Sequence, residues 1–510
     1  MKQSSQSNAI FRTLQWLKQP ANLIYTGLVA AIMVAYVALH FQASYTFPFP
    51  WPDEAHFIWQ ANGFAEHFTL FAPELNPDRT IFWMPPGYLV ILGIVIKLFG
   101  LSLVTARTFS LLLMLASIGI LAAIIRQYRA SLVSLLIAAP FALGAPFVAA
   151  GNIGRMEALL VLLVLCAFFL LQRGRLLFGL LLLALAPLVH PNGLYFLLTG
   201  IITAFLCAPR PLVWRRLAIG ELIMAALVVC AWGGYVVYAG LHWPDFMHDM
   251  GFQFERKAVR NIKDAVIMPC SVPLFALVML GSWYCWKKRL SVIFLLGIAA
   301  PAWWVAAAGI EMWYRVFFSI AFFLIAVISI GIAHHFATSG ERKWRNRSLA
   351  GTVILVAGFV IGWNVMSSSF GEPLVFGQSK PWYRMTSSDI PYITTTDRIA
   401  VESRIDQISA PMNVPVVEFY PAGDAFFFTD YAGSRIHFSY PLFSTRQPDW
   451  FFVHYSSRFT PAFNRYFREL LAAASVNLDS LARYQITLTR DGEAWFLIPG
   501  RNNPESRLHR

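Results

Sequence analysis

The stretch VTARTFSLLLMLASIGILAAII, residues 104–125, decides the class of fold. Most of its residues are apolar, and a helix of about 20 such residues is long enough to cross the hydrocarbon core of a membrane. Arg126 and Arg129 follow it closely. Because arginine and lysine collect in the loops on the cytoplasmic side of a membrane, this stretch predicts a membrane-spanning helix whose end faces the cytoplasm.

The composition of the whole chain agrees with that prediction. Of its 510 residues, 57% are hydrophobic and 13% are charged, and the mean hydropathy is +0.56. Soluble domains carry about 25% charged residues. The five cysteines all lie in apolar stretches and have the spacing of neither a zinc site nor a disulfide framework. The composition therefore excludes a disordered, collagen-like or disulfide-scaffold protein and indicates many membrane spans.

Eleven stretches, including the first, have the character of a spanning helix. They are residues 21–42, 104–125, 131–150, 157–172, 176–190, 192–208, 217–239, 267–286, 290–308, 313–335 and 348–367. The stretch 84–100 is also apolar, but it is short, and counting it as a span would place Arg126 and Arg129 on the outside. We therefore expect a partly embedded helix on the outer face there.

The basic residues orient these spans. If the N-terminus lies in the cytoplasm, every alternate loop that follows is basic. The formal net charge of +13, which alone would suggest nucleic acid, then owes much to topology, and we expect no nucleic-acid partner. The pattern predicts a multi-pass protein of the cytoplasmic (inner) membrane, with the C-terminus on the extracytoplasmic, periplasmic side.

The character of the chain changes after residue 367. Residues 368–510 are more polar, and the alternating stretches VPVVEFY (414–420) and PDWFFVHY (448–455) predict strands. Thr460-Pro461 begins a stretch with the pattern of a capped amphipathic helix. The predicted fold is an all-α membrane domain, residues 1–367, followed by a soluble extracytoplasmic α/β domain, residues 368–510.

The first outer loop, residues 43–103, contains the motif WPDEAHF at residues 51–57. Asp53 is well placed to cap the start of a helix, since Pro52 precedes it and Glu54 favours the first turn. It is also a candidate catalytic base, and the two roles do not exclude each other. His56, in the same motif, is a candidate substrate contact.

Glu157 begins an apolar helix at the membrane surface, where a carboxylate is costly unless it is paired or faces water. One interpretation is a carboxylate favoured by the helix dipole and paired with Arg155. The other is a second acidic residue that faces the same cavity as Asp53. Arg155 is itself a candidate substrate contact.

The outer loop 240–266 carries basic residues against the usual trend. Arg256, Arg260 and Lys263 would share one face of a helix. They suit either phospholipid headgroups or a bound anion. His242, Asp245, His248 and Asp249 lie in the same loop and resemble a metal cluster, but their spacing matches no strict signature, and we expect no metal site there.

Two further features belong to the outer face. Arg315 opens the span at 313–335 and is suited either to clamping a phosphate or to anchoring the helix at the interface. His190, followed by Pro191, Asn192 and Gly193, is explained most simply by a turn, and it is also a candidate substrate contact.

Carboxylates beside cations at a membrane surface suit one reaction well. A base removes the proton of an acceptor hydroxyl while a lipid-bound phosphate leaves the anomeric carbon of a sugar. Phosphate is a good leaving group, so no acid is needed to protonate it, in contrast to glycoside hydrolysis. One dominant base and cations that hold the departing phosphate would suffice.

The order of the motifs resembles that of a known family. An N-terminal span is followed by Asp53-Glu54 and Phe57, then by PPGY (85–88) and KLFG (97–100), and then by a span that begins with TAR (105–107). This resembles the polyprenyl-phosphate-sugar glycosyltransferases of the GT-C fold, which include the protein mannosyltransferases and the aminoarabinose and galacturonic acid transferases of lipid A. The resemblance covers roughly residues 20–335 and is most specific in the first outer loop.

The resemblance implies that Asp53 is the main catalytic base and that Glu54 supports the site. It implies that Glu157 binds or orients a sugar and that Arg315 contacts the lipid phosphate. One departure concerns Met84, because the aminoarabinose transferases have a phosphate-binding lysine at that position. Another cation would replace it, or the donor is held differently. The candidate cations are Arg79, Arg256 and Arg260.

The implied partners are a polyprenyl-phosphate sugar donor, an extracytoplasmic acceptor that is a glycan, lipid or protein, and membrane lipids. No cofactor is firmly implied. A transporter or lipid flippase is the rival class, but it predicts ionisable residues at mid-membrane and internal repeats. The spans are nearly free of charge, and the carboxylates gather at one face. A membrane-anchored binding protein is the second rival.

Overall fold

The computed structural model describes most of the N-terminal half of the chain and parts of the C-terminal quarter. The described residues are 19–43, 52–127 except 74 and 77, 132, 135, 139, 142–143, 151–207 except 192, 219–257, 395–409, 415–420, 436–438, 447–455, 468, 471, 482–488 and 494–500. All statements below concern these residues.

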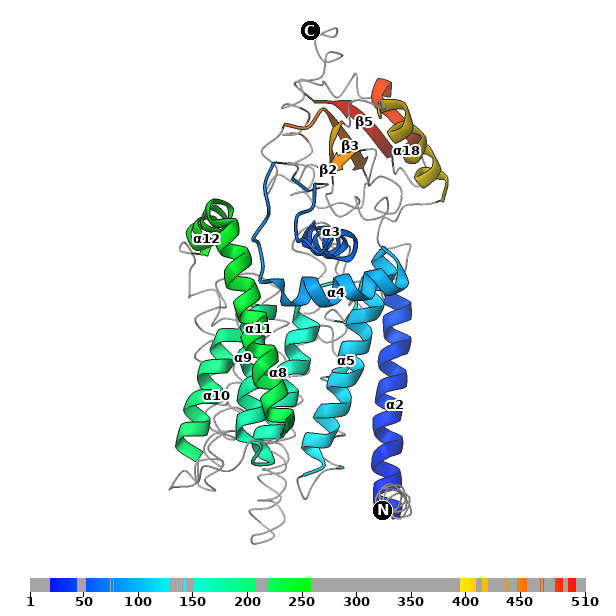
Figure 1. Ribbon diagram of the computed structural model, residues 1–510. Coiled ribbons are helices and arrows are strands. Elements are labelled where there is room, and N and C mark those ends of the chain that lie inside the picture. The colour runs from blue at the N-terminus through cyan, green and yellow to red at the C-terminus, as the bar shows by residue number, and fades with distance from the viewer. Residues whose placement is uncertain are drawn as a thin grey trace.

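Six long apolar helices run side by side through the lower half of Figure 1. They are α2 (Pro20–Ala43), α5 (Leu103–Ile125), α8 (Glu157–Gln172), α9 (Leu176–Val189), α10 (Gly193–Cys207) and α11 (Ile219–Leu241). Each coincides with an expected span to within a few residues. Helices α2, α5 and α11 are long and apolar enough to cross a membrane. The expected membrane all-α architecture is therefore confirmed, whereas the number of spans is not.

The remaining expected spans cannot be compared with the structure. Only a few single residues of the stretch 131–150 are described, and the stretches 267–286, 290–308, 313–335 and 348–367 lie outside the described residues.

Three helices lie at one end of the spanning helices. They are α3 (Pro52–His67), α4 (Pro86–Phe99) and α12 (Trp243–Lys257). In Figure 1, α4 lies across the ends of its neighbours instead of running beside them. A separate short helix within residues 84–100 is thus confirmed, and its partly embedded position at the outer face stays a prediction.

Close backbone contacts attach α4 to its neighbours. A Cβ atom on Gly93 would lie 2.6 Å from the carbonyl oxygen of Ala61 in α3. A Cβ atom on Gly87 would lie 2.7 Å from the carbonyl oxygen of Leu188 near the end of α9. Only glycine allows these approaches, because any other residue would clash with backbone that cannot move away easily. These two glycines therefore allow α3 and α9 to pack closely against α4.

The C-terminal part forms a five-stranded sheet with the order β2-β1-β3-β5-β4. The elements are α18 (Thr395–Ile408), β1 (Val416–Tyr420), β2 (His437–Phe438), β3 (Trp450–Tyr455), β4 (Gln485–Leu488) and β5 (Ala494–Pro499). β1 is parallel to β2 and β3, while β5 is antiparallel to β3 and β4. Both predicted strands are confirmed as β1 and β3. The predicted helix after Pro461 and the boundary at 367 lie almost wholly outside the described residues.

Aromatic stacking fills one face of this sheet. The rings of Phe419 and Phe452, from neighbouring strands, stack with their centroids 5.1 Å apart. The rings of His454 and Trp495 stack at 4.7 Å. Figure 1 places the sheet beyond α3, at the end of the spanning helices opposite the start of α2.

Candidate functional site

The motif at residues 51–57 opens helix α3. The helix begins at Pro52, and proline favours the first helical position because its ring presets the backbone angle there. The backbone of Asp53 therefore lies within the first turn, not at the residue before it, where a capping side chain would act.

Glu54 joins three elements. Its Oε1 accepts a hydrogen bond of 3.0 Å from Nε of Arg107 in α5, and its Oε2 accepts one of 2.8 Å from Nη2 of the same guanidinium. The backbone N–H of Gly154, which precedes α8, donates to Oε1 over 2.6 Å. Only 2% of the Arg107 side chain and none of the Glu54 side chain is exposed. The carboxylate thus fastens the first turn of α3 to two spanning helices.

Small residues let this arrangement form. A Cβ atom on Gly154 would lie 3.0 Å from Cβ of Ala106 and 3.4 Å from Oε1 of Glu54. A larger side chain at Gly154 would therefore crowd α5 and move the donating N–H. Because a buried charge is costly unless it is paired and hydrogen-bonded, the bidentate contact with Arg107 is what makes Glu54 tolerable in this position.

Glu157 forms a second buried pair. Nε of Arg155 lies 3.1 and 3.2 Å from its two carboxylate oxygens, and Nη2 of Arg155 lies 3.1 Å from Oε1. The guanidinium of Arg155 also lies over the ring of Phe57 in α3, 5.5 Å from its centroid. The interpretation that Glu157 pairs with Arg155 is confirmed, and the pair lies beside the helix that carries Asp53.

Tyr88 of α4 completes this buried cluster. Its ring lies edge-on to Phe57 at 6.4 Å and stacks on Phe109 at 6.3 Å. Burial raises the pKa of the Tyr88 hydroxyl. The hydroxyl therefore stays protonated. Neither Tyr88 nor Arg107 was assigned a role from the sequence, although an arginine within an apolar span is a recognisable signal.

His56 points into the protein interior. Its side chain is fully buried, and its Nε2 donates to Oε1 of Gln60 over 2.6 Å. Burial disfavours the charged ring and lowers the pKa of His56 to about 3. Gln60 in turn donates to the carbonyl oxygens of Leu70 and Ile81, at 3.1 and 2.7 Å. The candidate substrate contact His56 thus belongs to a chain of hydrogen bonds that connects α3 to the loop after it.

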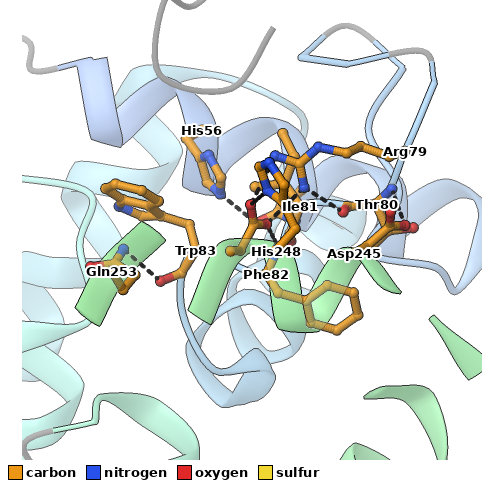
Figure 2. Close-up of polar contacts among 11 residues, drawn as sticks. His56, Arg79, Thr80, Ile81, Phe82, Trp83, Asp245, His248 and Gln253 are labelled. Atoms are coloured by element: carbon orange, nitrogen blue, oxygen red, sulfur yellow. Dashed lines mark hydrogen bonds and ion pairs between the residues drawn. The ribbon is translucent and has the colours of Figure 1, made fainter. Parts of the chain in front are cut away.

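Figure 2 shows how α12 holds the extended segment 79–83. Arg79 forms a bidentate pair with Asp249, with Nη1–Oδ2 and Nη2–Oδ1 distances of 2.9 and 2.8 Å. The N–H of Thr80 donates to Asp245 over 3.1 Å, and the N–H of Phe82 donates to Asp249 over 2.7 Å.

The contacts between α12 and the segment 79–83 are regularly spaced. Asp245, Asp249 and Gln253 are four residues apart, so they lie along one side of α12. Gln253 donates to the carbonyl oxygen of Trp83 over 3.5 Å. Four residues of helix and two residues of extended chain cover similar lengths, roughly 6 to 7 Å. Side chains of α12 therefore satisfy the backbone groups that a neighbouring strand would satisfy in a sheet.

The Arg79–Asp249 pair bears on two features of this region, the candidate phosphate ligand Arg79 and the metal-like cluster that includes Asp249. Burial alone would raise the pKa of Asp249, but hydrogen bonds from Arg79 and from the N–H of Phe82 outweigh it and lower the pKa. Arg79, a candidate phosphate ligand, is thus engaged by a carboxylate. In the part of the chain that the structure describes, no group of three or more His, Cys, Asp or Glu residues could hold a metal ion.

His190 ends α9 in an extended conformation. Its carbonyl oxygen accepts from the N–H of Gly193 over 2.8 Å, which confirms the expected turn. Its side chain is buried. The backbone of Arg256 lies in α12, but its side chain falls outside the described residues, as do Arg260 and Arg315 altogether.

Comparisons with known proteins bear on the fold. The sequence matches no protein-family model and no curated protein. The structure is similar to ArnT from Cupriavidus metallidurans, solved bound to undecaprenyl phosphate and in the apo state. Both comparisons have 14% identity over 94% of this chain and 98% of that chain, with TM-scores of 0.53 and 0.54.

An oligosaccharyltransferase from Archaeoglobus fulgidus is a more distant match, with 12% identity, coverage of 84% of this chain and 65% of that chain, and a TM-score of 0.49. The similarity to the two ArnT structures extends over nearly the full length of both chains. The chain therefore has the GT-C fold, as the motifs of its first outer loop predicted.

Proposed function

We propose that this protein is a membrane glycosyltransferase that moves a sugar from a polyprenyl-phosphate donor to an acceptor outside the cytoplasm. The observation that carries the proposal is the full-length similarity to ArnT, one structure of which holds undecaprenyl phosphate. The motif that suggested this chemistry lies in α3, a helix at one end of the spanning bundle. The acceptor class is a lipid such as lipid A, a polysaccharide or a protein.

Asp53 is the proposed base that takes the proton of the acceptor hydroxyl. Support comes from its place in the first turn of α3, next to a residue that is fastened to α5 and to Gly154. A base must be held within hydrogen-bond reach of its substrate, so a fixed first turn suits this role. Glu54 would then support the site by holding the turn, and Glu157 by holding Arg155 beside Phe57.

The donor phosphate requires cations. Arg315, Arg256 and Arg260 are the proposed ligands, together with Arg79. Of the three arginine–carboxylate pairs described above, the Arg79 pair is the one with appreciable exposure, since 13% of the Arg79 side chain is accessible. Nη1 of Arg79 donates to Asp249 and to the carbonyl oxygen of Thr80, and Nη2 donates to Asp249. A phosphate could share the guanidinium with Asp249 through the second N–H of Nη2, because arginine has five N–H donors.

The decisive variant is Asp53→Asn. We expect it to abolish sugar transfer while the protein still inserts and folds, because the amide keeps the size of the side chain but cannot accept a proton. Glu66→Gln is the matched control, since Glu66 lies in the same helix with 59% of its side chain exposed. The measurement is mass spectrometry of lipid A, other glycans and polyprenyl-phosphate sugars. It compares cells that produce the unmodified protein, cells that produce each variant and cells that lack the gene.

The outcomes separate the competing functions. Loss of a sugar from one acceptor, together with accumulation of a lipid-linked sugar, would identify both substrates. Normal transfer by Asp53→Asn would eliminate Asp53 as the base. Altered transbilayer distribution of a lipid-linked sugar without any change in glycosylation would instead indicate a flippase.

A further inference from the structure

Helix α12 has an unusual distribution of polar and apolar residues. Its acidic side, Asp245 and Asp249, faces the protein and binds the segment 79–83. Its opposite side exposes large apolar residues, with Trp243 55% and Met247 50% exposed. A helix that packs on a protein and faces water normally buries its apolar side and exposes its polar side. The surroundings of the exposed side are therefore expected to be apolar.

The exposed side of α12 continues that of α11. Helix α11 is a candidate membrane span, and Trp232 attaches it to α9 through a 2.8 Å hydrogen bond to the carbonyl oxygen of Ala184. Val236, Val237 and Leu241, in its last two turns, are exposed. Only His242 separates α11 from α12. The ring of His242 lies 5.0 Å from that of Tyr238 and 6.2 Å from that of Phe82, so it packs against the protein, and the apolar surface of the span continues onto α12.

Aromatic contacts fix the junction between the two helices. The ring of Phe246 in α12 lies 6.4 Å from that of Tyr235 and stacks on Trp243 at 5.6 Å. Phe82, from the segment that α12 holds, lies edge-on to Phe246 at 5.6 Å. Tryptophan and tyrosine are enriched where a spanning helix meets the headgroup region, because their rings are apolar with one polar atom.

We propose that α12 lies in the membrane interface, with Trp243 and Met247 inserted among the lipids of the leaflet next to it. The neighbouring span supports a lipid surface as the partner, because α11 is a candidate membrane span and its exposed apolar side continues on α12. This proposal goes beyond the proposed reaction and does not depend on it.

The consequence is a connection between the bilayer and the loop that leads into α4. One side of α12 contacts lipid, and the other holds the backbone of residues 80–82 through Asp245 and Asp249. The position of this loop, and with it the start of α4 at Pro86, would then be set by the depth of α12 in the membrane.

Site-directed spin labelling of the full-length protein in lipid nanodiscs tests this proposal. The native cysteines are first replaced by serine or alanine. They are Cys166, Cys207, Cys230, Cys270 and Cys285. Met247→Cys then carries the label under test. Val229→Cys, exposed in the middle of α11, is the lipid reference, and Arg404→Cys, exposed on α18, is the aqueous reference. Accessibility to oxygen and to a water-soluble nickel chelate is measured for each label.

We expect the label at Met247 to give values between those at Val229 and Arg404, because the interface is shallower than the middle of a span: it should be more accessible to oxygen and less accessible to the nickel chelate than the label at Arg404. A label as accessible to the chelate as the one at Arg404 would place α12 in water and overturn the proposal. A label accessible to neither reagent would also overturn it, because another part of the protein would then cover this side. His248→Cys, on the neighbouring polar edge, is expected to be more accessible to the chelate than Met247→Cys.

Discussion

At the scale of single residues, Arg107 has the largest structural consequence. It lies in the second turn of an otherwise apolar helix, where a lone charge would be costly, and its guanidinium faces the carboxylate of Glu54. The pair is hidden from solvent, so its energy depends on both partners being present. The residue one position before Glu54 is the proposed base, which links this pair to the chemistry.

A double-mutant cycle tests the pair. Arg107→Met leaves a buried, unpaired carboxylate, and we expect it to destabilise the protein by about 3–5 kcal/mol. Adding Glu54→Gln removes that uncompensated charge and should recover a large part of the loss. Thermal unfolding in detergent measures the single variants Arg107→Met and Glu54→Gln and the double variant. If the two single losses simply added in the double variant, the residues would not act as a pair.

His56 predicts a dependence of stability on pH. Burial holds its pKa at about 3 in the folded protein, against 6.5 in the unfolded chain. The unfolded chain therefore binds the proton first, so stability is full above pH 6.5 and is lost as the pH falls toward 3. The slope is at most about 1.4 kcal/mol per pH unit. His56→Gln should flatten this dependence, as followed by thermal unfolding between pH 7 and 4.

The exposed His67 provides the matched control, since 72% of its side chain is accessible. His67→Gln should leave the pH dependence as in the unmodified protein. An identical slope in the unmodified protein and in His56→Gln would show that other groups cause it.

At the scale of elements, the side chains of α12 bind backbone groups of residues 80–83, as a neighbouring strand would in a sheet. Residues 80–83 are extended but pair with no strand in the described structure, and their backbone groups are satisfied by side chains of α12 and α3. A segment held by side chains depends on a few individual residues, whereas a strand in a sheet depends on a ladder of backbone bonds.

This arrangement makes a prediction with single-residue resolution. Asp249→Ala should speed hydrogen exchange at the amide of Phe82 by about 10-fold or more, because that amide loses a charge-assisted hydrogen bond. Asp245→Ala should do the same at Thr80 and leave Phe82 protected. Amide-resolved exchange measured by mass spectrometry distinguishes the two. Equal changes at both amides in both variants would mean that α12 detaches as a whole.

At the scale of the whole molecule, the start of α2 and the C-terminal sheet lie at opposite ends of the spanning helices. The helices α3, α4 and α12 lie at the same end as the sheet. The proposed base and the sheet would therefore face the same compartment, and the basic loops of the sequence predict that it is the extracytoplasmic one.

Reporter fusions test this orientation. Alkaline phosphatase fused after Arg510 should be active, because the enzyme requires export, and a fluorescent protein fused after Arg129 should be fluorescent, because it folds in the cytoplasm. If the reporters are exchanged, we expect the phosphatase after Arg129 to be inactive and the fluorescent protein after Arg510 to be non-fluorescent. An inactive phosphatase after Arg510 would contradict the expected topology.

Much of this architecture could be predicted from local patterns. The apolar runs predicted α2, α5, α8, α9, α10 and α11, and alternation predicted β1 and β3. The length of the apolar stretch 84–100 predicted a short, separate helix, which is α4. The motif around Asp53 pointed to the fold that the ArnT comparison supports. These features depend on neighbours in the sequence, which is why the sequence reveals them.

The pairing of charges could not be predicted in the same way. The sequence by itself determined the class of protein and the positions of the six apolar helices named above, because apolar composition and helix length are local properties. The order of its motifs pointed to the GT-C fold. Only the tertiary structure decided that Glu54 meets Arg107 and that Arg79 meets Asp249, partners 53 and 170 residues apart. Such partners are chosen by the packing of helices, since a buried charge is stable only where the fold brings its opposite within hydrogen-bonding distance.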